Sequence, residues 1–192
     1  MADVSRRALF GRIFGRAAEQ ARALPERLET PNLPADLPPE RRPPGAVKEG
    51  LFLQRCTRCG DCVAACPERA IHTFSQDTGV RAGTPVMQPH LVPCIMCDGF
   101  PCAAACPEGA LEMPETPIWS LGKVAVRSER CITWMGPECG ACVDVCPGDL
   151  KAMALKRWRP FVDEETCVGC GLCIAACPTS PKALELVPLA WT

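Results

Sequence analysis

The residues of this chain that could do chemistry are its cysteines, which number 16 in 192 residues and fall into four motifs of four. In the first motif three cysteines are spaced three residues apart, a fourth follows four residues later, and a proline comes next. The other motifs repeat this order, two of them with one longer gap. The four motifs are Cys56, Cys59, Cys62 and Cys66; Cys94, Cys97, Cys102 and Cys106; Cys131, Cys139, Cys142 and Cys146; and Cys167, Cys170, Cys173 and Cys177.

This spacing suits the chemistry of iron–sulfur cubes. Thiolate is the soft anionic ligand that the iron corners of a [4Fe–4S] cluster take. Three cysteines in a tight loop reach three corners of one cube, and the fourth ligates the cluster of a partner motif. We therefore predict four [4Fe–4S] clusters with all 16 cysteines as iron ligands, and no catalytic residue. We expect Gly60, Gly169 and Gly171 to let backbone amides approach the sulfurs.

Three other uses of cysteine compete with clusters. Paired CxxC motifs can hold structural zinc, but a zinc site does not need a third cysteine at +6 and a fourth before a proline. A disulfide scaffold is typical of secreted chains, and we see no secretory signal. A lone CxxC can be a redox dithiol. The full motifs favour clusters over all three.

Composition limits the other possibilities. The formal net charge is −1, and each oxidised cluster with its four thiolates would add about −2, so nothing indicates nucleic-acid binding. Large core-forming residues are scarce, with 6 Phe, 4 Trp and no Tyr, so folding should be coupled to cluster binding. We expect the tryptophans to pack against the domain. His72 and His90 are not spaced as metal ligands. The sequence contains no phosphate-binding loop and no dinucleotide fingerprint. No apolar run is long enough to span a membrane.

The chain divides into three parts. Residues 1–24 show apolar residues at helical spacing among arginines, which predicts an amphipathic helix. This helix could dock on a partner or a membrane surface. Residues 25–48 are rich in proline and predict an extended tether. Residues 49–192 hold the four motifs and form the predicted cluster domain.

The predicted fold class is α+β, with two ferredoxin-like 2[4Fe–4S] modules in one cluster-rich domain. Each motif should follow a short strand and lead through a helical turn into another strand. Adjacent pairing would join motif one to two and three to four, whereas nested pairing would join one to four and two to three. The strands are expected at residues 50–53, 70–74, 86–88, 110–113, 123–127, 151–155, 160–163 and 183–187.

The cluster arrangement resembles the NapF/NapG (MauM) group of ferredoxin-type proteins over most of the chain. The stretched second motif, Cys94 to Cys106, is similar to that of NapG. The seven-residue gap between Cys131 and Cys139 is similar to the third motif of both NapF and NapG. Ser5-Arg6-Arg7 resembles the start of a twin-arginine export signal, but Arg12 and Arg16 interrupt the apolar run that should follow, which is similar to NapF.

The resemblance implies an electron carrier without a substrate site, working with a molybdoenzyme or another oxidoreductase in the cytoplasm, although export together with a partner stays open. Two alternatives are a maturation factor for a molybdenum or iron–sulfur enzyme, docking through residues 1–24, and a permanent subunit of a redox complex. The stretched second motif also looks like that of electron-transfer subunits of molybdopterin oxidoreductases, which favours nested pairing.

Overall fold

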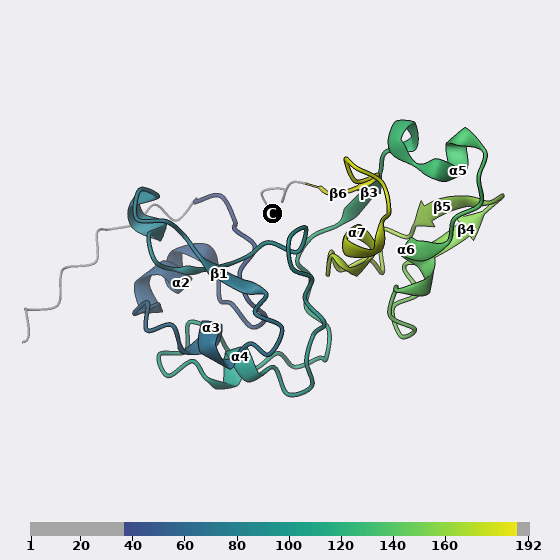
Figure 1. The fold of residues 1–192 in the computed structure, drawn as a ribbon. Helices are drawn as coiled ribbons and strands as arrows, with labels where there is room; N and C mark the ends of the chain where they lie inside the picture. Colours follow the sequence, from purple (N-terminus) through teal and green to yellow (C-terminus); the bar gives the residue numbers. More distant parts are fainter. Residues whose placement is uncertain (1–36, 188–192) are drawn as a thin grey trace, which may run out of the picture. The chain divides into compact units, whose positions relative to one another are not determined.

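The computed structural model describes residues 37–187, in which short helices and short strands alternate with turns (Figure 1). The predicted helix over residues 1–24 and the first half of the predicted tether lie outside these residues, so both stay predictions. The compartment inferred from the arginines of that helix stays a prediction as well. Among residues 37–187, no helix is long and apolar enough to cross a membrane.

The helices are one or two turns long. The α-helices are α2 (Glu49–Arg55), α3 (Asp61–Ala65), α4 (Pro101–Ala104), α5 (Ile132–Met135), α6 (Ala141–Asp144) and α7 (Leu172–Ala176), and the 3-10 helices are η1 (Gly79–Arg81) and η2 (Ser128–Arg130). The strands are β1 (Ile71–Thr73), β2 (Pro85–Met87), β3 (Val124–Val126), β4 (Met153–Lys156), β5 (Arg159–Val162) and β6 (Leu184–Leu186).

The strands pair in the same order in the first half (residues 37–122) and the second half (residues 123–187) of the described chain. In the second half β4 and β5 form an inner antiparallel hairpin. Strand β3 precedes this hairpin in the sequence, β6 follows it, and the two pair antiparallel. In the first half β1 and β2 form the inner antiparallel pair. The outer pairing there is a single antiparallel bridge between Ala46 and Leu111. The two halves therefore repeat one topology.

Six of the eight predicted strands overlap strands of the structure, and two predictions are wrong. Residues 50–53 belong to helix α2, and residues 110–113 contribute only the bridge at Leu111. A short apolar run such as Leu51 to Leu53 does not by itself distinguish helix from strand. The tertiary structure decides, because the neighbours Phe52 and Leu53 are both buried, whereas neighbours in a strand point to opposite faces.

A buried arginine fixes the start of the first half. Arg42 has a side chain only 4% exposed, and its guanidinium pairs with Glu49 of α2 through Nε–Oε2 at 2.9 Å and Nη2–Oε1 at 2.6 Å. Its Nη1 donates to Thr84 Oγ1 at 2.8 Å and to the Pro85 carbonyl at 2.6 Å. The guanidinium carbon lies 4.4 Å from the centroid of the Phe52 ring. The buried guanidinium of Arg42 therefore has hydrogen-bond acceptors at Nε, Nη1 and Nη2.

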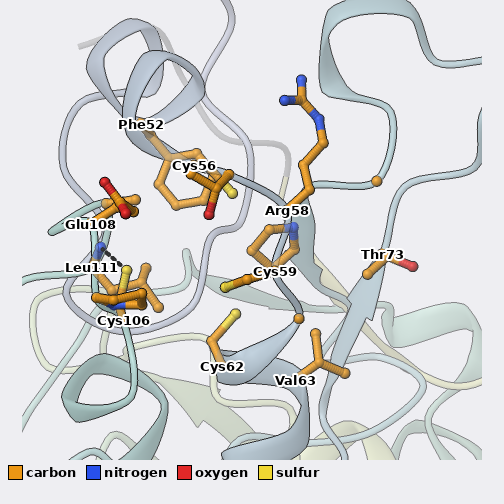
Figure 2. A pocket seen from close by; sticks show the side chains of 16 residues that line it. Phe52, Cys56, Arg58, Cys59, Cys62, Val63, Thr73, Cys106, Glu108 and Leu111 are labelled. Atoms are coloured by element: carbon orange, nitrogen blue, oxygen red, sulfur yellow. Dashed lines mark hydrogen bonds between the residues drawn. The ribbon is translucent and has the colours of Figure 1, made fainter. Parts of the chain in front are cut away.

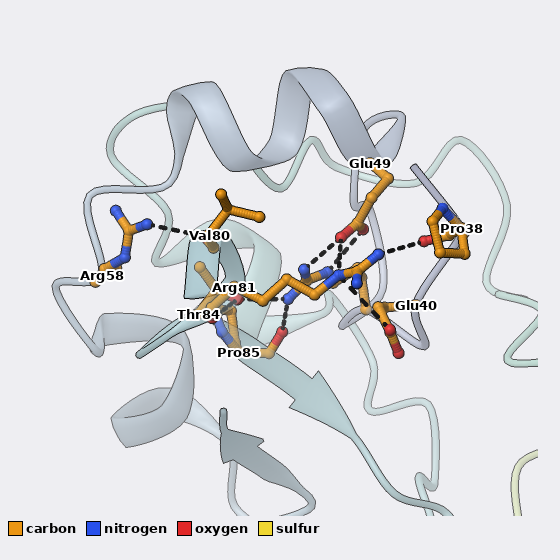
Figure 3. A network of polar contacts seen from close by, with 9 residues as sticks. Pro38, Glu40, Glu49, Arg58, Val80, Arg81, Thr84 and Pro85 are labelled. Carbon is orange, nitrogen blue, oxygen red and sulfur yellow. Dashed lines mark hydrogen bonds and ion pairs between the residues drawn. The ribbon is translucent and has the colours of Figure 1, made fainter. Parts of the chain in front are cut away.

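Further contacts surround this pair. Arg81 donates to Glu49 Oε1 at 3.2 Å and to the Pro38 carbonyl at 2.7 Å, as Figure 3 shows. Pro43 and Pro44 are almost fully buried. These contacts place residues 37–48 against the rest of the first half. The described end of the predicted tether thus packs against residues 49–122.

The core of the second half is small and rich in cysteine. Its aliphatic members include Val124, Met153, Ile174 and Leu184, with alanines between them. Four further members are thiols: Cys142, Cys167, Cys173 and Cys177. Four of the predicted ligands are therefore also members of the hydrophobic core of this half.

We predict that Arg42→Met lowers the stability of the holoprotein by about 3 kcal/mol, because it leaves the carboxylate of Glu49 buried beside an apolar side chain. Denaturant unfolding, followed anaerobically by far-UV circular dichroism, measures the change. The matched control is Arg127→Met, which removes an exposed ion pair with Glu185 and should move the midpoint little. Equal shifts in both variants would contradict the buried pair as the anchor of residues 37–48.

Candidate metal centres

Each motif places its third cysteine on a short helix. This cysteine sits in the first turn of the helix and is buried, with at most 8% of its surface exposed. The fourth cysteine follows the last turn of the same helix, where the chain leaves helical geometry. The buried third cysteines are Cys62 on α3, Cys102 on α4, Cys142 on α6 and Cys173 on α7.

The first cavity, named for the motif that supplies three of its cysteines, has a volume of about 430 Å³. Its walls include Cys56, Cys59 and Cys62 of motif one and Cys106 of motif two. Figure 2 shows the sulfurs of Cys59, Cys62 and Cys106 turned toward the same space. The ring of Phe52 closes part of the wall. The lining is therefore a set of thiols with mostly apolar surroundings.

The other three cavities repeat this composition, with volumes of about 310 to 360 Å³. In each, three cysteines come from one motif and one from its neighbour in sequence. The second cavity has Cys94, Cys97, Cys102 and Cys66; the third has Cys131, Cys139, Cys142 and Cys177; and the fourth has Cys167, Cys170, Cys173 and Cys146. All 16 predicted cysteines thus line a cavity, and all 16 thiols are free.

Neighbouring motifs exchange their fourth cysteines, so the pairing is adjacent. Motif one gives Cys66 to the second cavity and receives Cys106 in the first. Motif three gives Cys146 to the fourth cavity and receives Cys177 in the third. The nested pairing that the second motif favoured is wrong, because it would require Cys177 beside Cys56. The contacts of α3 with α4 and of α6 with α7 bring the adjacent motifs together.

The cavities fit an iron–sulfur cube by the chemistry of their donors. Four thiols surround a space in each case. Backbone amides also face the sulfurs. The amides of Ala70 and Leu111 donate to Cys66 and Cys106 at 3.4 Å each. Hydrogen bonds to the sulfurs are one of the means by which a protein sets cluster potential.

Burial makes these thiols harder to ionise. Burial, together with the neighbouring Cys56 and Cys59, raises the pKa of Cys62 to about 12. Burial and the neighbouring Cys170 likewise raise the pKa of Cys173 to about 12. Such thiols stay protonated at neutral pH unless a metal displaces the proton. The folded cavities therefore favour either neutral thiols or thiolates bound to cationic iron.

Cys177 is a buried cysteine whose pKa is lowered. Burial acts to raise its pKa, but hydrogen bonds from the Thr179 hydroxyl and from backbone amides, with the charge of Lys182, lower it overall. The Thr179 hydroxyl lies 3.2 Å from the sulfur. In the third cavity, the surroundings of Cys177 thus favour the thiolate, whereas burial raises the pKa of Cys142 to about 11.

Both irregular gaps add structure to a cavity. In motif two the extra residues place Phe100 in the wall of the second cavity with 5% of its surface exposed, and Pro101 begins α4. In motif three the insertion forms α5, whose Ile132 and Thr133 line the third cavity. Sequence reasoning did not find Phe100 or Phe52 as wall residues. A signal for Phe100 exists, since it is the one large apolar residue in the extra length.

The predicted approach of backbone amides to the sulfurs at the glycines stays a prediction, and the structure adds a steric role for one of them. Gly60 and Gly171 both have positive φ, +85° and +89°, at the start of α3 and α7. A side chain at Gly60 would meet open space, whereas a Cβ at Gly171 would lie 2.0 Å from the carbonyl oxygen of Pro89. Gly171 therefore permits a close approach between backbones of the two halves.

Backbone hydrogen bonds join the two halves at their cysteine loops. The amide of Cys94 donates to the carbonyl of Cys170 at 2.9 Å. Cys94 lines the second cavity and Cys170 the fourth. Nearby, the amide of Leu121 donates to the carbonyl of Val168 at 2.7 Å. The second and fourth cavities are thus neighbours, and the first and third lie at the two ends of the series.

Comparison with known proteins points the same way. A family model described as a 4Fe–4S dicluster domain matches residues 55–110 and 93–150, and one described as a 4Fe–4S binding domain matches residues 158–179. The chain is 36% identical over 163 residues to the ferredoxin-type protein NapG of Escherichia coli, covering 78% of this chain and 71% of that protein.

Two further relatives widen the comparison. The methylamine utilization ferredoxin-type protein MauM of Methylobacillus flagellatus is 35% identical over 192 residues, covering 94% of this chain and 77% of that protein. The polyferredoxin-like subunit of an aliphatic sulfonate oxidoreductase of Pyrococcus furiosus is 33% identical over 116 residues, covering 53% and 57%. The similarity to NapG and MauM confirms the predicted resemblance to the NapG and MauM group. The predicted likeness to NapF rests on the N-terminal residues and stays a prediction.

We predict that Gly171→Ala loses about 3 kcal/mol or more of stability, because the new Cβ meets the Pro89 carbonyl. Gly79→Ala is the matched control, because Gly79 has φ +61°, faces open space and lines none of the four cavities, and this variant should lose only about 1–2 kcal/mol. Anaerobic urea unfolding, followed by visible absorbance of the holoprotein, compares the two. Similar losses would mean that backbone strain alone, and not the contact between halves, makes glycine necessary.

We predict that Cys177→Ser changes the same cluster signal as Cys139→Ser and leaves the signal that Cys59→Ser changes untouched. The reason is that Cys177 lines the third cavity and not the first. Electron paramagnetic resonance of each dithionite-reduced variant provides the comparison. Loss of the Cys59-dependent signal in Cys177→Ser would restore the nested pairing.

Proposed function

Because the chain belongs to the NapG and MauM family of ferredoxin-type iron–sulfur proteins, we propose that it carries electrons through four [4Fe–4S] clusters to or from a partner oxidoreductase. Ferredoxin-type proteins are electron carriers without a substrate site of their own. The observation that carries the proposal is the set of four cavities, each lined by four cysteines in a three-plus-one arrangement. This is the ligand set that a cube needs.

The proposal assigns the 16 cysteines as iron ligands in two ferredoxin-like modules. The repeated strand order supports one module in each half of residues 37–187. The exchange of Cys66 with Cys106, and of Cys146 with Cys177, supports two cubes in each module. Each exchanged cysteine follows a short helix that begins at one cavity and ends at the other. These helices hold the two sites of a module at a fixed separation.

Electrons would move along the series from the first cavity to the second, then the fourth, then the third. A bound [4Fe–4S] cluster takes up or gives back one electron at a time, with potentials between about −700 and +450 mV in known proteins. The chain contributes the sulfur ligands, the hydrogen bonds to them and the apolar walls that limit water. The amide-to-carbonyl bond between Cys94 and Cys170 supports transfer between the two halves at this point.

The partner is proposed as an oxidoreductase by analogy with the relatives. The printed names of those relatives associate them with methylamine utilization and with an aliphatic sulfonate oxidoreductase. These names support a redox partner in general and do not select one enzyme. A molybdoenzyme stays within this proposal as one member of the class.

We predict about 16 iron and about 16 sulfide per chain in anaerobically purified protein, from four cubes. Dithionite reduction should give an electron paramagnetic resonance spectrum of interacting S = 1/2 centres, because neighbouring clusters share short helices. A content of about 8 iron would contradict clusters in two of the cavities. Zinc in place of iron, with no clusters after reconstitution with iron and sulfide, would contradict the electron-transfer function altogether.

A further inference from the structure

The hairpin of β4 and β5 ends in an exposed tip of basic and aromatic residues. Lys156 pairs with Arg159 across the hairpin, so Arg157 and Trp158 form a two-residue turn. All four residues are exposed, and Trp158 has 69% of its surface accessible in place of the packing predicted for it. We name residues 156–159 the hairpin tip. Three positive charges and one large aromatic ring thus project together from the end of a strand pair.

The backbone of this turn is unfavourable for the residues that occupy it. Arg157 has φ +52° and Trp158 has φ +65°, so both central residues are in the left-handed region. A two-residue hairpin turn of this kind is normally made by Asn-Gly or Asp-Gly, which adopt positive φ more easily. Neither side chain has a hydrogen bond or ion pair within residues 37–187. The fold therefore gains nothing visible from Arg-Trp at this place, and such strain is a sign of function.

Stacked cation–aromatic pairs extend the surface below the tip. Lys156 Nζ lies 3.2 Å from the ring centroid of Phe161, and the Arg159 guanidinium lies 5.3 Å from the ring of Trp134. Trp134 belongs to α5, the helix made by the insertion of motif three, and the adjacent Met135 is 65% exposed. Figure 1 shows α5 beside the β4–β5 hairpin. The insertion and the hairpin therefore form one continuous surface.

This surface lies beside the third cavity, one end of the series. Pro160, which directly follows the hairpin tip, lines that cavity, and so does Ile132 of α5. A partner seated on the tip and on Met135 would approach the third cavity from outside. Electron transfer between proteins requires a close approach of the two redox centres, which this surface would allow at the third cavity.

We infer that the hairpin tip, with Trp134 and Met135 of the motif-three insertion, is the docking surface for an acidic face of an electron-transfer partner protein, which exchanges electrons at the third cavity. The inference rests on the proposed electron-transfer function. Three basic residues select an acidic surface and speed its encounter with the chain, while Trp158 and Met135 supply apolar contact. Aromatic residues, methionine and arginine are the types enriched in protein interfaces.

The test replaces the tip by an ordinary turn. The double variant Arg157→Asn with Trp158→Gly removes one charge and the exposed ring while relieving the backbone strain. The probe is reduced flavodoxin, a small acidic one-electron carrier, mixed with the oxidised holoprotein in a stopped-flow spectrometer. The matched control is Lys48→Asn, which removes one exposed charge from the first half.

We expect the variant to fold with an unchanged or higher melting temperature and full iron content, but to accept electrons from flavodoxin at least fivefold more slowly. The wild-type rate should fall as ionic strength rises, and the control should match the wild type. An unchanged rate in the double variant overturns the inference, as does a wild type that dithionite reduces but flavodoxin does not.

Two other outcomes separate this inference from its alternatives. If wild-type clusters are not reduced even by dithionite, the proposed function fails, and not the docking surface alone. If the wild type binds vesicles of phosphatidylcholine with phosphatidylglycerol and the double variant does not, while both accept electrons equally from flavodoxin, the tip binds an anionic membrane surface. That result overturns the protein partner.

Discussion

The exchange of one cysteine between neighbouring motifs is the constraint on which the rest of residues 37–187 depends. Each cavity needs four sulfurs, and a single tight loop supplies only three. The fourth must arrive from another loop, so two motifs have to face each other before either cavity is complete. Burial raises the pKa of thiols such as Cys62 and Cys173, so the buried sulfurs favour bound protons or cationic iron. We therefore expect ligation and folding to be coupled in this chain.

The interactions that do not involve sulfur hold the halves in place around these cavities. Arg42 connects α2 to the turn before β2 through Glu49 and Thr84, and its guanidinium covers Phe52, which is itself a wall of the first cavity. Where the two halves meet, backbone contacts backbone directly, and Gly171 leaves the room for this. A small domain with little aromatic core achieves order in this way, by a few buried polar contacts and close backbone approach.

The irregular gaps of motifs two and three show how loop length is used. The added residues of motif two bring an aromatic ring into a cavity wall, which excludes water from that site. Those of motif three form α5, which lines the third cavity on one side and stacks Trp134 on Arg159 of the hairpin on the other. The same insertion thus shields one end of the series and builds the surface beside it.

The sequence by itself determined which cysteines gather, their grouping in threes and the prediction of [4Fe–4S] clusters, because these depend on spacing within one loop. It also indicated six of the strands, since alternation and turn residues are local signals. Only the tertiary structure decided which motif donates Cys177, that residues 50–53 are helical, and that Arg42 is buried in the domain. It also decided that Trp158 is exposed at a strained turn. The cysteine exchange, the helix and the buried arginine depend on contacts between residues far apart in the chain, for which local spacing carries no information.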